Sequence, residues 1–389
     1  MSAPAAAKRI DDIELLRAFA VLMVLLEHAH GNLITWPGAA FDLFNRHFNG
    51  GAGVDLFFAI SGFVIARDLL PKLAASATRA DFFNVSVAFW IRRAWRILPS
   101  AWLWLAVILA ATLFFNHSGA FRSFDATAAG TIAALMQFYN VHFSNCFMSY
   151  DCGTNSVYWS LSLEEQFYLA LPLVAFLCRG RLALLQILLI VLVVLQLVSQ
   201  RSLLLVMFRT DALLLGVLIA IQSAKAGYQH CEPRFLSTLG NTRLPLTLVL
   251  VAAVASTASS EWLLAPYRFG IVALIAALLV WLASFDRDYL MAPTIGKRML
   301  LWVGSRSYAI YLIHVPAYLA TREFWFRVAP QGTILDASWT LTFVLTATVL
   351  TGVLAEFNYR LIETPLRRKG VVIAARFVAR RMPLPAGQG

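Results

Sequence analysis

The sequence predicts an all-α, polytopic membrane protein, with about ten transmembrane helices in one bundle and both termini in the cytoplasm. Composition is the first reason for this prediction. Of the 389 residues, 60% are hydrophobic and only 14% are charged, and the mean hydropathy is +0.70, far outside the range of a soluble domain. Apolar stretches near the ~20 residues that cross a bilayer recur along the chain, and basic residues are concentrated in alternate connecting segments.

The apolar stretches define the predicted spans in order along the chain. A further apolar segment, 127–143, is short, and we interpret it as a re-entrant or interfacial piece. The predicted spans are residues 13–34, 51–68, 99–116, 158–178, 182–200, 203–222, 244–258, 266–284, 299–320 and 338–361.

Lysine and arginine residues set the predicted orientation. With the amino terminus inside, most of the 32 basic residues fall in cytoplasmic segments, as the positive-inside rule requires. The net charge of +11 then reflects a cationic inner face that meets anionic membrane lipids, so no nucleic-acid partner is needed to explain it. A cleaved signal peptide over residues 8–30 is the alternative for the first span, but Arg17, Glu27 and His28 interrupt its apolar run.

Domain organisation is predicted to be simple. We expect one membrane domain at 1–368 and a basic cytoplasmic tail at 369–389, because no internal repeat or soluble domain is visible. The four cysteines have no metal-ligand spacing, so we expect no metal cofactor. Cys146 and Cys152 share the outer loop 117–157, where a disulfide and two free thiols are both compatible with the sequence.

The first span carries ionisable residues at bilayer depth. His28 follows Arg17 by eleven residues, almost three helical turns, so the two share a face about 16 Å apart along the axis, and Glu14 joins that face. Ionisable groups in lipid cost on the order of 3 kcal/mol or more, and they normally face a bundle interior or a wet cavity. His28, with Glu27 beside it, is therefore a candidate for proton transfer. The structural alternative is a packing histidine and an arginine that only sets topology.

Polar residues also mark the second span and the segment before the third. Asp55 lies in the first turn of its helix, where the dipole favours an anion, and Ser61 with Gly62 permits close helix packing. Arg93 and Arg96 are spaced i,i+3, so a short helix would present them together at the cytoplasmic surface. Such a cluster either anchors the chain at the interface or clamps phosphate groups of a cytosolic ligand.

The fourth span begins with a group of polar side chains near the predicted outer leaflet. Helix initiation accounts for one of the carboxylates of Glu164 and Glu165, since acids in a first turn complement the dipole. It does not readily account for both together with Tyr168. These residues could hold sugar hydroxyls or orient a catalytic imidazole.

Later spans carry two further polar groups. Arg209 and Asp211 lie at the outer portion of the sixth span, and a local ion pair between them is the simplest interpretation. Ser307 and His314 share one face of the ninth span because they are spaced i,i+7. For His314, a packing role and a working role both stay open.

Seven motifs follow one another along the chain. They are Arg17 with His28, GVDLFFAISGF at 53–63, RRAWRILP at 92–99, WSLSLEEQFYL at 159–169, RTDALLLG at 209–216, SYAIYLIHVP at 307–316 and YRLIETP at 359–365. In this order they resemble the acyltransferase 3 family of multi-pass membrane O-acyltransferases, over nearly the whole chain. The additional soluble domain that many members carry has no counterpart here, so we expect a stand-alone membrane enzyme.

The resemblance implies an activity and a set of site residues. Such enzymes take an acyl group, usually acetyl, from cytosolic acyl-CoA and esterify a hydroxyl of a surface glycan or lipid-linked saccharide outside the bacterial inner membrane. In the family the first-span histidine is regarded as catalytic, its partner arginine as essential for donor binding, and the RxxR pair as a contact to coenzyme A phosphates. These roles fall here on His28, on Arg17, and on Arg93 with Arg96.

We predict that His28 removes the proton from an acceptor hydroxyl while the oxygen of that hydroxyl attacks the thioester carbonyl. We also predict that Glu27 or Glu164 fixes the tautomer of the imidazole. The predicted partners are acetyl-CoA or another acyl-CoA, a glycan or glycolipid acceptor, and membrane lipids. A covalent acyl-enzyme relay is an alternative mechanism, and a transporter of a lipid or saccharide precursor is an alternative function. The predicted substrate-binding residues are Asp55, Glu165, Tyr168, Ser307 and His314.

Overall fold

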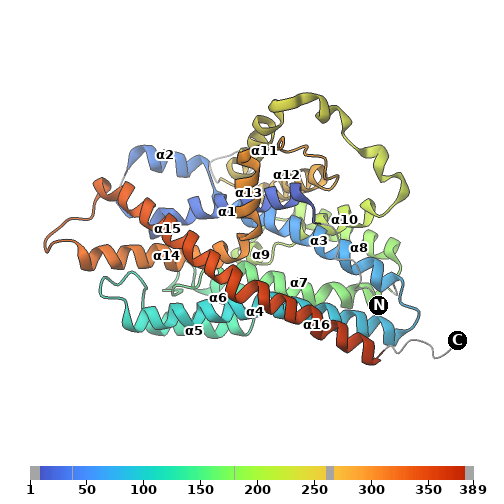
Figure 1. Cartoon of the computed structure of the whole chain (residues 1–389), viewed down its shortest axis with the longest axis horizontal. Helices are drawn as coiled ribbons and strands as arrows, with labels where there is room; N and C mark the ends of the chain where they lie inside the picture. The colour runs from blue at the N-terminus through green and yellow to red at the C-terminus, as the bar shows by residue number, and fades with distance from the viewer. Residues whose placement is uncertain (1–8, 37, 179, 260–266, 382–389) are drawn as a thin grey trace. The chain divides into compact units, whose positions relative to one another are not determined.

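A computed structural model describes residues 9–36, 38–178, 180–259 and 267–381 (Figure 1). These residues form helices joined by connecting segments, and the only β-type pairing among them is an isolated bridge between His30 and Ile34. The all-α prediction is therefore confirmed. The last part of the predicted tail, 382–389, and the first residue of the span predicted at 266–284 lie outside the described residues.

The chain divides into two compact units, which are described separately below. The first unit comprises Met1–Asp68, Gln186–Tyr311 and Asp336–Thr340, and the second comprises Leu69–Leu185, Leu312–Leu335 and Leu341–Gly389. Helices wholly or mainly in the first unit are α1 (Asp11–Asn32), α2 (Ala39–His47), η1 (Gly50–Ala52), α3 (Gly53–Ala74), α8 (Leu182–Val198), α9 (Leu203–Met207), α10 (Asp211–Ser223), η2 (Ala226–Cys231), η3 (Arg234–Thr242), α11 (Arg243–Thr257), α12 (Arg268–Ala283), α13 (Ile295–Ser305) and η5 (Ala337–Trp339). Those of the second unit are α4 (Arg79–Phe114), α5 (Phe124–Leu135), α6 (Tyr139–Cys146), α7 (Tyr158–Leu177), α14 (Ser307–Val328), α15 (Thr340–Phe357), the π-helical turn η6 (Asn358–Glu363) and α16 (Thr364–Arg381).

Within the described ranges, three helical stretches are long and apolar enough to cross a membrane. They are Arg79–Phe114, Leu203–Ser223 and Ala337–Arg381, with 36, 21 and 45 residues. The pair Arg234–Gly240 and Arg243–Thr257, bent by 117°, would make a fourth if counted as one span. Helices are present at the other predicted spans too, but ten crossings and cytoplasmic termini stay predictions.

Two predicted spans have different limits in the structure. The span predicted at 299–320 is divided between α13 and α14, and the division follows Gly304, which packs directly on α1. The helix predicted at 99–116 already begins at Arg79 as α4, because Thr78 and Asp81 form a capping box with hydrogen bonds of 3.0 and 3.1 Å. The arginines at 92–96 therefore lie inside a long helix, and the separate short surface helix that we predicted is wrong.

Glycines bring the backbone of α1 into close contact with its neighbours in the first unit. A Cβ atom at Gly304, Gly53 or Gly50 would lie only 1.9, 2.4 or 2.1 Å from the carbonyl oxygen of Glu14, Ala20 or Met23, respectively. No larger residue fits such contacts, so these three glycines fix α1 along most of its length. Regular helical geometry then ends at His30 and at Gly31, which has a φ of 76°.

A second close crossing joins α3 and α10, also in the first unit. A Cβ at Gly62 would lie 2.0 Å from the carbonyl oxygen of Leu213, and a Cβ at Gly216 would lie 2.1 Å from that of Ala59. At this crossing, each glycine packs against the backbone of the other helix. Ser61 and Gly62 predicted such close packing for α3.

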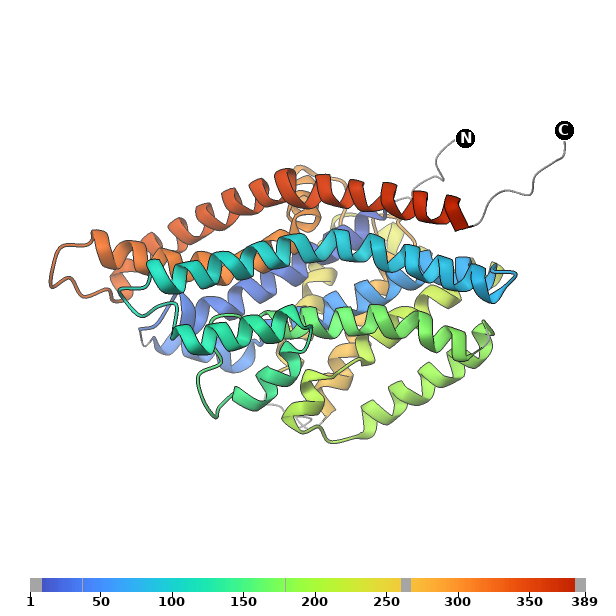
Figure 2. The same cartoon turned by 90° about the horizontal axis from the view of Figure 1, so that it is seen from below.

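In the second unit, α16 runs along α4 (Figures 1 and 2). A Cβ at Gly370 would lie 2.3 Å from the Cβ of Trp95, so the two helices meet closely there. Nearer the start of this stretch, Asn358 of η6 accepts a hydrogen bond from Trp104 Nε1 (3.2 Å) and donates one to Ser100 Oγ (3.1 Å). These buried polar contacts fix the register of the two helices.

Candidate functional site

His28 lies in the last regular turn of α1 and is half-buried. Its Nδ1 is 2.9 Å from the carbonyl oxygen of Val24, an acceptor that requires the proton to be on Nδ1. The neutral imidazole then has its lone pair on Nε2, which is the state a general base needs. We predicted that a carboxylate would fix this tautomer, but a main-chain carbonyl of the same helix does so.

Glu27, the neighbour of His28, contacts the segment before α3. Its Oε2 accepts a hydrogen bond of 2.7 Å from the backbone N–H of Gly50. The same glycine packs on the backbone of α1 at Met23. Glu27 therefore ties the end of α1 to η1, and its charge also acts on the imidazole of His28.

Arg17 and Glu14, which the spacing placed on one face of α1, form an ion pair. Nη1 of Arg17 is 2.6 Å from Oε1 of Glu14, and Nη2 of Arg9 is 3.2 Å from the other oxygen of the same carboxylate. Two guanidinium groups thus share one carboxylate, and two further carboxylates, those of Asp11 and Asp12, lie in the same first turn of α1.

Asp55 is held by a buried bidentate ion pair. Its two oxygens accept hydrogen bonds of 2.7 and 3.0 Å from Nε and Nη2 of Arg209. Asp211 instead pairs with Arg201, at 2.6 Å. The local pair between Arg209 and Asp211 that we predicted is therefore wrong, because the close crossing of α3 and α10 places Asp55 beside Arg209.

In the second unit, Arg93 lies beside the acidic residues of α7. Its guanidinium carbon is 5.5 Å from the ring centroid of Phe89 and 5.4 Å from that of Tyr168, whose hydroxyl donates a hydrogen bond to Glu164. Glu165 is within electrostatic reach of Arg93, and its buried Oε1 has no hydrogen-bond partner among the residues that the structure describes.

Arg93 and the two glutamates were predicted at opposite membrane surfaces, and that part of the prediction is wrong. The long helix α4 packs against α7, where Trp90 Nε1 donates a 3.0 Å hydrogen bond to the carbonyl oxygen of Tyr168. Residues of both helices therefore lie at one level.

The remaining predicted residues lie on α4 and α14. Arg96 is half-buried on α4, and Ser307 and His314 of α14 are 6% and 0% exposed. The His314 ring packs edge-on against Tyr318, at 5.8 Å between centroids. Of the predicted site residues, the first unit holds Arg17, Glu27, His28, Asp55 and Ser307, and the second holds Arg93, Arg96, Glu164, Glu165, Tyr168 and His314.

Sequence reasoning missed two arginines of the first unit that contact Phe269. The guanidinium carbons of Arg201 and Arg268 lie 5.9 and 5.0 Å from the Phe269 ring centroid. Neither arginine is part of a recognised motif. The one signal available was their place in segments predicted to be outside, where the positive-inside rule makes arginine uncommon.

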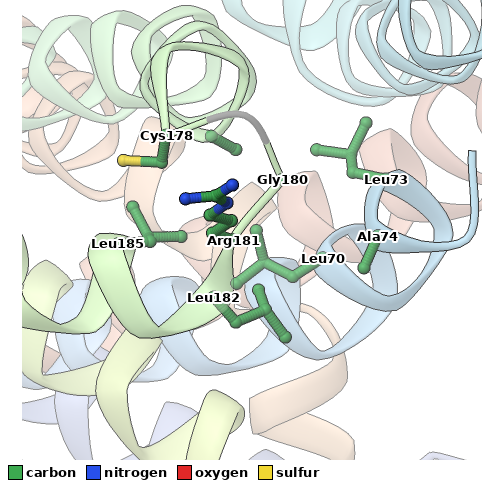
Figure 3. Close-up of a pocket in the computed structure, with 9 residues that line it drawn as sticks. Leu70, Leu73, Ala74, Cys178, Gly180, Arg181, Leu182 and Leu185 are labelled. Carbon is green, nitrogen blue, oxygen red and sulfur yellow. The ribbon is translucent and has the colours of Figure 1, made fainter.

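Figure 3 shows a small cavity in the second unit, between the end of α7 and the start of α8. Its free volume of about 10 Å³ is close to the space of one water molecule, so it does not accommodate a donor or an acceptor. Its lining residues are Leu70, Leu73, Ala74, Ala175, Cys178, Gly180, Arg181, Leu182 and Leu185.

Cys146 and Cys152 are joined by a disulfide, which decides between the two alternatives that the sequence left open. Cys178 and Cys231 are free thiols. Within the described part of the chain, no cluster of three or more His, Cys, Asp or Glu side chains could hold a metal ion.

Residues 10–356 match the model of a protein family that is described as "Acyltransferase domain". The chain belongs to this acyltransferase 3 family. The match extends across both units and includes His28, Arg17, Arg93 and Arg96. Comparison with solved structures gives no match.

Relatives in the acyltransferase 3 family have related names and greater lengths. YrhL of Bacillus subtilis, named as a candidate peptidoglycan O-acetyltransferase, is 29% identical over 387 residues, which cover 93% of this chain and 55% of YrhL. O-acetyltransferase OatA of Staphylococcus aureus is 26% identical over 377 residues, 91% of this chain and 57% of OatA. Peptidoglycan O-acetyltransferase OatA of Listeria monocytogenes is 26% identical over 386 residues, 94% of this chain and 57% of the relative. The chain thus spans little more than half the length of these relatives.

Proposed function

We propose that this protein is a membrane O-acetyltransferase that moves an acetyl group from acetyl-CoA to a hydroxyl of a glycan, with peptidoglycan as the acceptor class. Family membership and the names of the relatives support the reaction type and the acceptor class. The observation that carries the proposal is the hydrogen bond between His28 Nδ1 and the Val24 carbonyl, because it places the proton on Nδ1 and so selects the tautomer in which Nε2 is the basic atom.

In the proposed reaction, His28 Nε2 removes the proton from the acceptor hydroxyl while the hydroxyl oxygen attacks the thioester carbonyl. A carbon–oxygen bond forms and the carbon–sulfur bond breaks. The proton then passes from the imidazolium to the leaving thiolate, so the products are the glycan ester and the free thiol. Glu27 stabilises the imidazolium electrostatically during this step.

For the donor, we propose that an arginine contacts the phosphate groups of the coenzyme, with Arg17 of the first unit and Arg96 of the second unit as separate candidates. A phosphate at Arg93 would have to compete with Glu164 and Glu165, so we propose that Arg93 positions Tyr168 instead. Substrate contacts through Asp55, Glu165, Tyr168, Ser307 and His314 stay predictions.

Replacing His28 tests the proposal directly. In nanodiscs, the purified full-length chain is given acetyl-CoA and a peptidoglycan strand, and thiol release and ester formation are measured. We expect His28→Ala to lose about 10²–10⁴-fold in turnover. His47→Gln is the matched control, because the Nδ1 atom of His47 also contacts a carbonyl four residues earlier, that of Leu43 at 3.0 Å, but on the exposed helix α2.

Three results would change the proposal. Equal turnover by the native chain and His28→Ala would remove His28 from the chemistry. Ester formation without thiol release from acetyl-CoA would assign a different donor. Movement of the glycan into sealed proteoliposomes that contain the native chain, without any ester, would favour the transporter.

A further inference from the structure

Three guanidinium groups surround the ring of Phe269 in the first unit. Those of Arg268, Arg209 and Arg201 lie 5.0, 5.1 and 5.9 Å from its centroid. Two carboxylates accompany them, because Asp55 pairs with Arg209 and Asp211 pairs with Arg201. These five charged side chains together carry one positive charge in excess.

Several polar atoms of this cluster are buried without a hydrogen-bond partner among the residues that the structure describes. The side chain of Arg201 is only 5% exposed, and its Nη2 donates to Asp211 and to the carbonyl oxygen of Gln196, while no described acceptor meets Nη1. Within the described ranges, Nε of Arg268 and Oδ1 of the fully buried Asp211 likewise have no hydrogen-bond partner. Since buried polar groups in proteins are nearly always satisfied, these atoms point to a ligand that accepts from two arginines and donates to one carboxylate.

The surroundings of the cluster are rigid. The crossing at Gly62 and Gly216 holds α3 against α10 and so fixes the Asp55–Arg209 pair. Gly270, next to Phe269, packs so closely on α8 that a Cβ there would lie 2.6 Å from Leu197 Cδ2. The ring and the charges around it are therefore held by helix packing, as a binding site requires.

We propose that this cluster binds an acidic group of the acceptor, a carboxylate or phosphate ester with a hydroxyl or amide N–H beside it. Arg201 and Arg268 hold the oxyanion, which guanidinium groups do well, and Asp211 accepts the neighbouring hydrogen bond. The inference rests on the proposed function and narrows its acceptor from peptidoglycan in general to a glycan strand that carries a free acidic group beside the hydroxyl or amide. The arginines also lie in segments predicted to face outward, the side from which the glycan would arrive.

The test compares two acceptors that differ only in charge. One is a glycan-strand fragment with a free carboxylate on its sugar, and the other is the same fragment with that carboxylate converted to an amide. The native chain in nanodiscs of neutral lipid should have a KM about tenfold lower for the acid, as expected for one charge-assisted contact. Arg268→Gln should raise the KM for the acid to that for the amide, and Arg268→Lys should restore part of the difference.

Arg46→Gln is the matched control, because it removes an exposed arginine from a segment that is also predicted to be outside. It should keep the preference of the native chain for the acid. A native chain with equal KM values for acid and amide would overturn the inference, and so would Arg268→Gln with an unchanged preference, which would leave water as the occupant.

Two further arms complete the experiment. The first distinguishes a lipid headgroup from the saccharide as the ligand of the cluster, and the second separates failure of the proposed binding site from failure of the proposed function. If Arg268→Gln lowers activity only in nanodiscs that contain phosphatidylglycerol, the oxyanion is a lipid headgroup and the saccharide assignment is wrong. If the native chain acetylates neither fragment, the proposed function fails, but calorimetric binding of the acid fragment still tests the site. Binding that is lost in Arg268→Gln supports the inference, and binding that is equal in both proteins overturns it.

Discussion

One buried ion pair of the first unit joins residues from distant parts of the sequence. Asp55 and Arg209 are 1% and 6% exposed in their side chains and share two hydrogen bonds. Removing one member of such a pair strands the other in a site where water cannot solvate it. The stability of the unit should therefore depend on this pair more than on pairs at the surface.

Asp55→Ala is expected to lower the free energy of unfolding by about 3–5 kcal/mol, because Arg209 is left buried without its counter-ion. Denaturant titration of the purified protein measures this change. Glu356→Gln is the control, since its partner Arg360 is 70% exposed and such pairs contribute about 0–1 kcal/mol. Similar losses in both variants would contradict the expectation.

Glu232, between α10 and α11, should make stability depend on pH. A hydrogen bond of 2.9 Å from Tyr289, together with Arg234 and Arg287, lowers the pKa of its carboxyl below the ordinary 4.5. A lowered native pKa means that the stabilisation is present above the unfolded value and is lost as pH falls through the native one.

The melting temperature of the native chain, followed from neutral pH down to about pH 3, should therefore fall more steeply below pH 4.5 than that of Glu232→Gln. Tyr289→Phe removes the largest cause of the shift but keeps Arg234 and Arg287, so its curve should lie between those of the native chain and Glu232→Gln. Parallel curves for all three proteins would show that this carboxyl does not contribute.

At the residue scale, local spacing was a good guide and distant pairing was not. The helical period placed Glu14 beside Arg17, and the structure has that pair. The helical period could not show that His28 Nδ1 would donate a hydrogen bond to the carbonyl oxygen of Val24 in the same helix. Nor could it show that Arg209 would form its ion pair with Asp55 and not with Asp211. Those choices depend on which helices cross, and a single sequence does not contain that information in a readable form.

Helices of this chain approach one another closely where a glycine, which has no side chain, lies at the contact. At the crossing of α3 and α10, an added methyl group at either glycine would lie about 2 Å from a carbonyl oxygen of the other helix. Backbone atoms cannot move aside as a flexible side chain can, so the helices themselves would have to separate.

Gly216→Ala is therefore expected to cost about 1–3 kcal/mol or more and to disturb the Asp55–Arg209 pair. Gly352→Ala in α15 is the control, because a Cβ there meets nothing within 4 Å among the described residues. This control should be neutral or should stabilise the helix by up to ~1 kcal/mol, as alanine is the better helix former. Thermal unfolding of both variants in the same detergent measures these changes in stability. A smaller loss of stability in Gly216→Ala than in Gly352→Ala would contradict the expectation.

Element positions were predicted well, and element limits less well. Apolar runs located α1, α3, α7, α8, α11 and α12, because burial in helices requires such runs. They did not show that α4 would continue through its arginines, since charged residues interrupt an apolar pattern without interrupting a helix. The capping box at Thr78 was the available signal for its true beginning.

The topology of the whole molecule is the part of the prediction that still needs a direct measurement. Positive-inside counting places the loop that contains Cys146 and Cys152 outside, and these residues form a disulfide, as extracytoplasmic cysteines often do. The same counting places Cys231, between α10 and α11, inside.

Thiol labelling of intact cells tests this orientation. After reduction, a membrane-impermeant maleimide should label Cys152 in spheroplasts, whereas Cys231 should react only after the membrane is opened. Variants with single remaining cysteines identify each signal. Labelling of Cys231 in closed spheroplasts would reverse the predicted orientation.

The continuous helical stretch Ala337–Arg381 has 45 residues, about 68 Å at the α-helical rise, more than twice the ~30 Å of bilayer hydrocarbon. If this stretch crosses a bilayer once, we expect a large part of it to extend beyond the hydrocarbon at the carboxyl-terminal end, together with the part of α4 that Gly370 contacts at Trp95. Arg367, Arg368 and Lys369 lie in this part of α16, which we call the stem. A negatively charged molecule that diffuses along that side would be attracted to the stem before it reached the lipid surface.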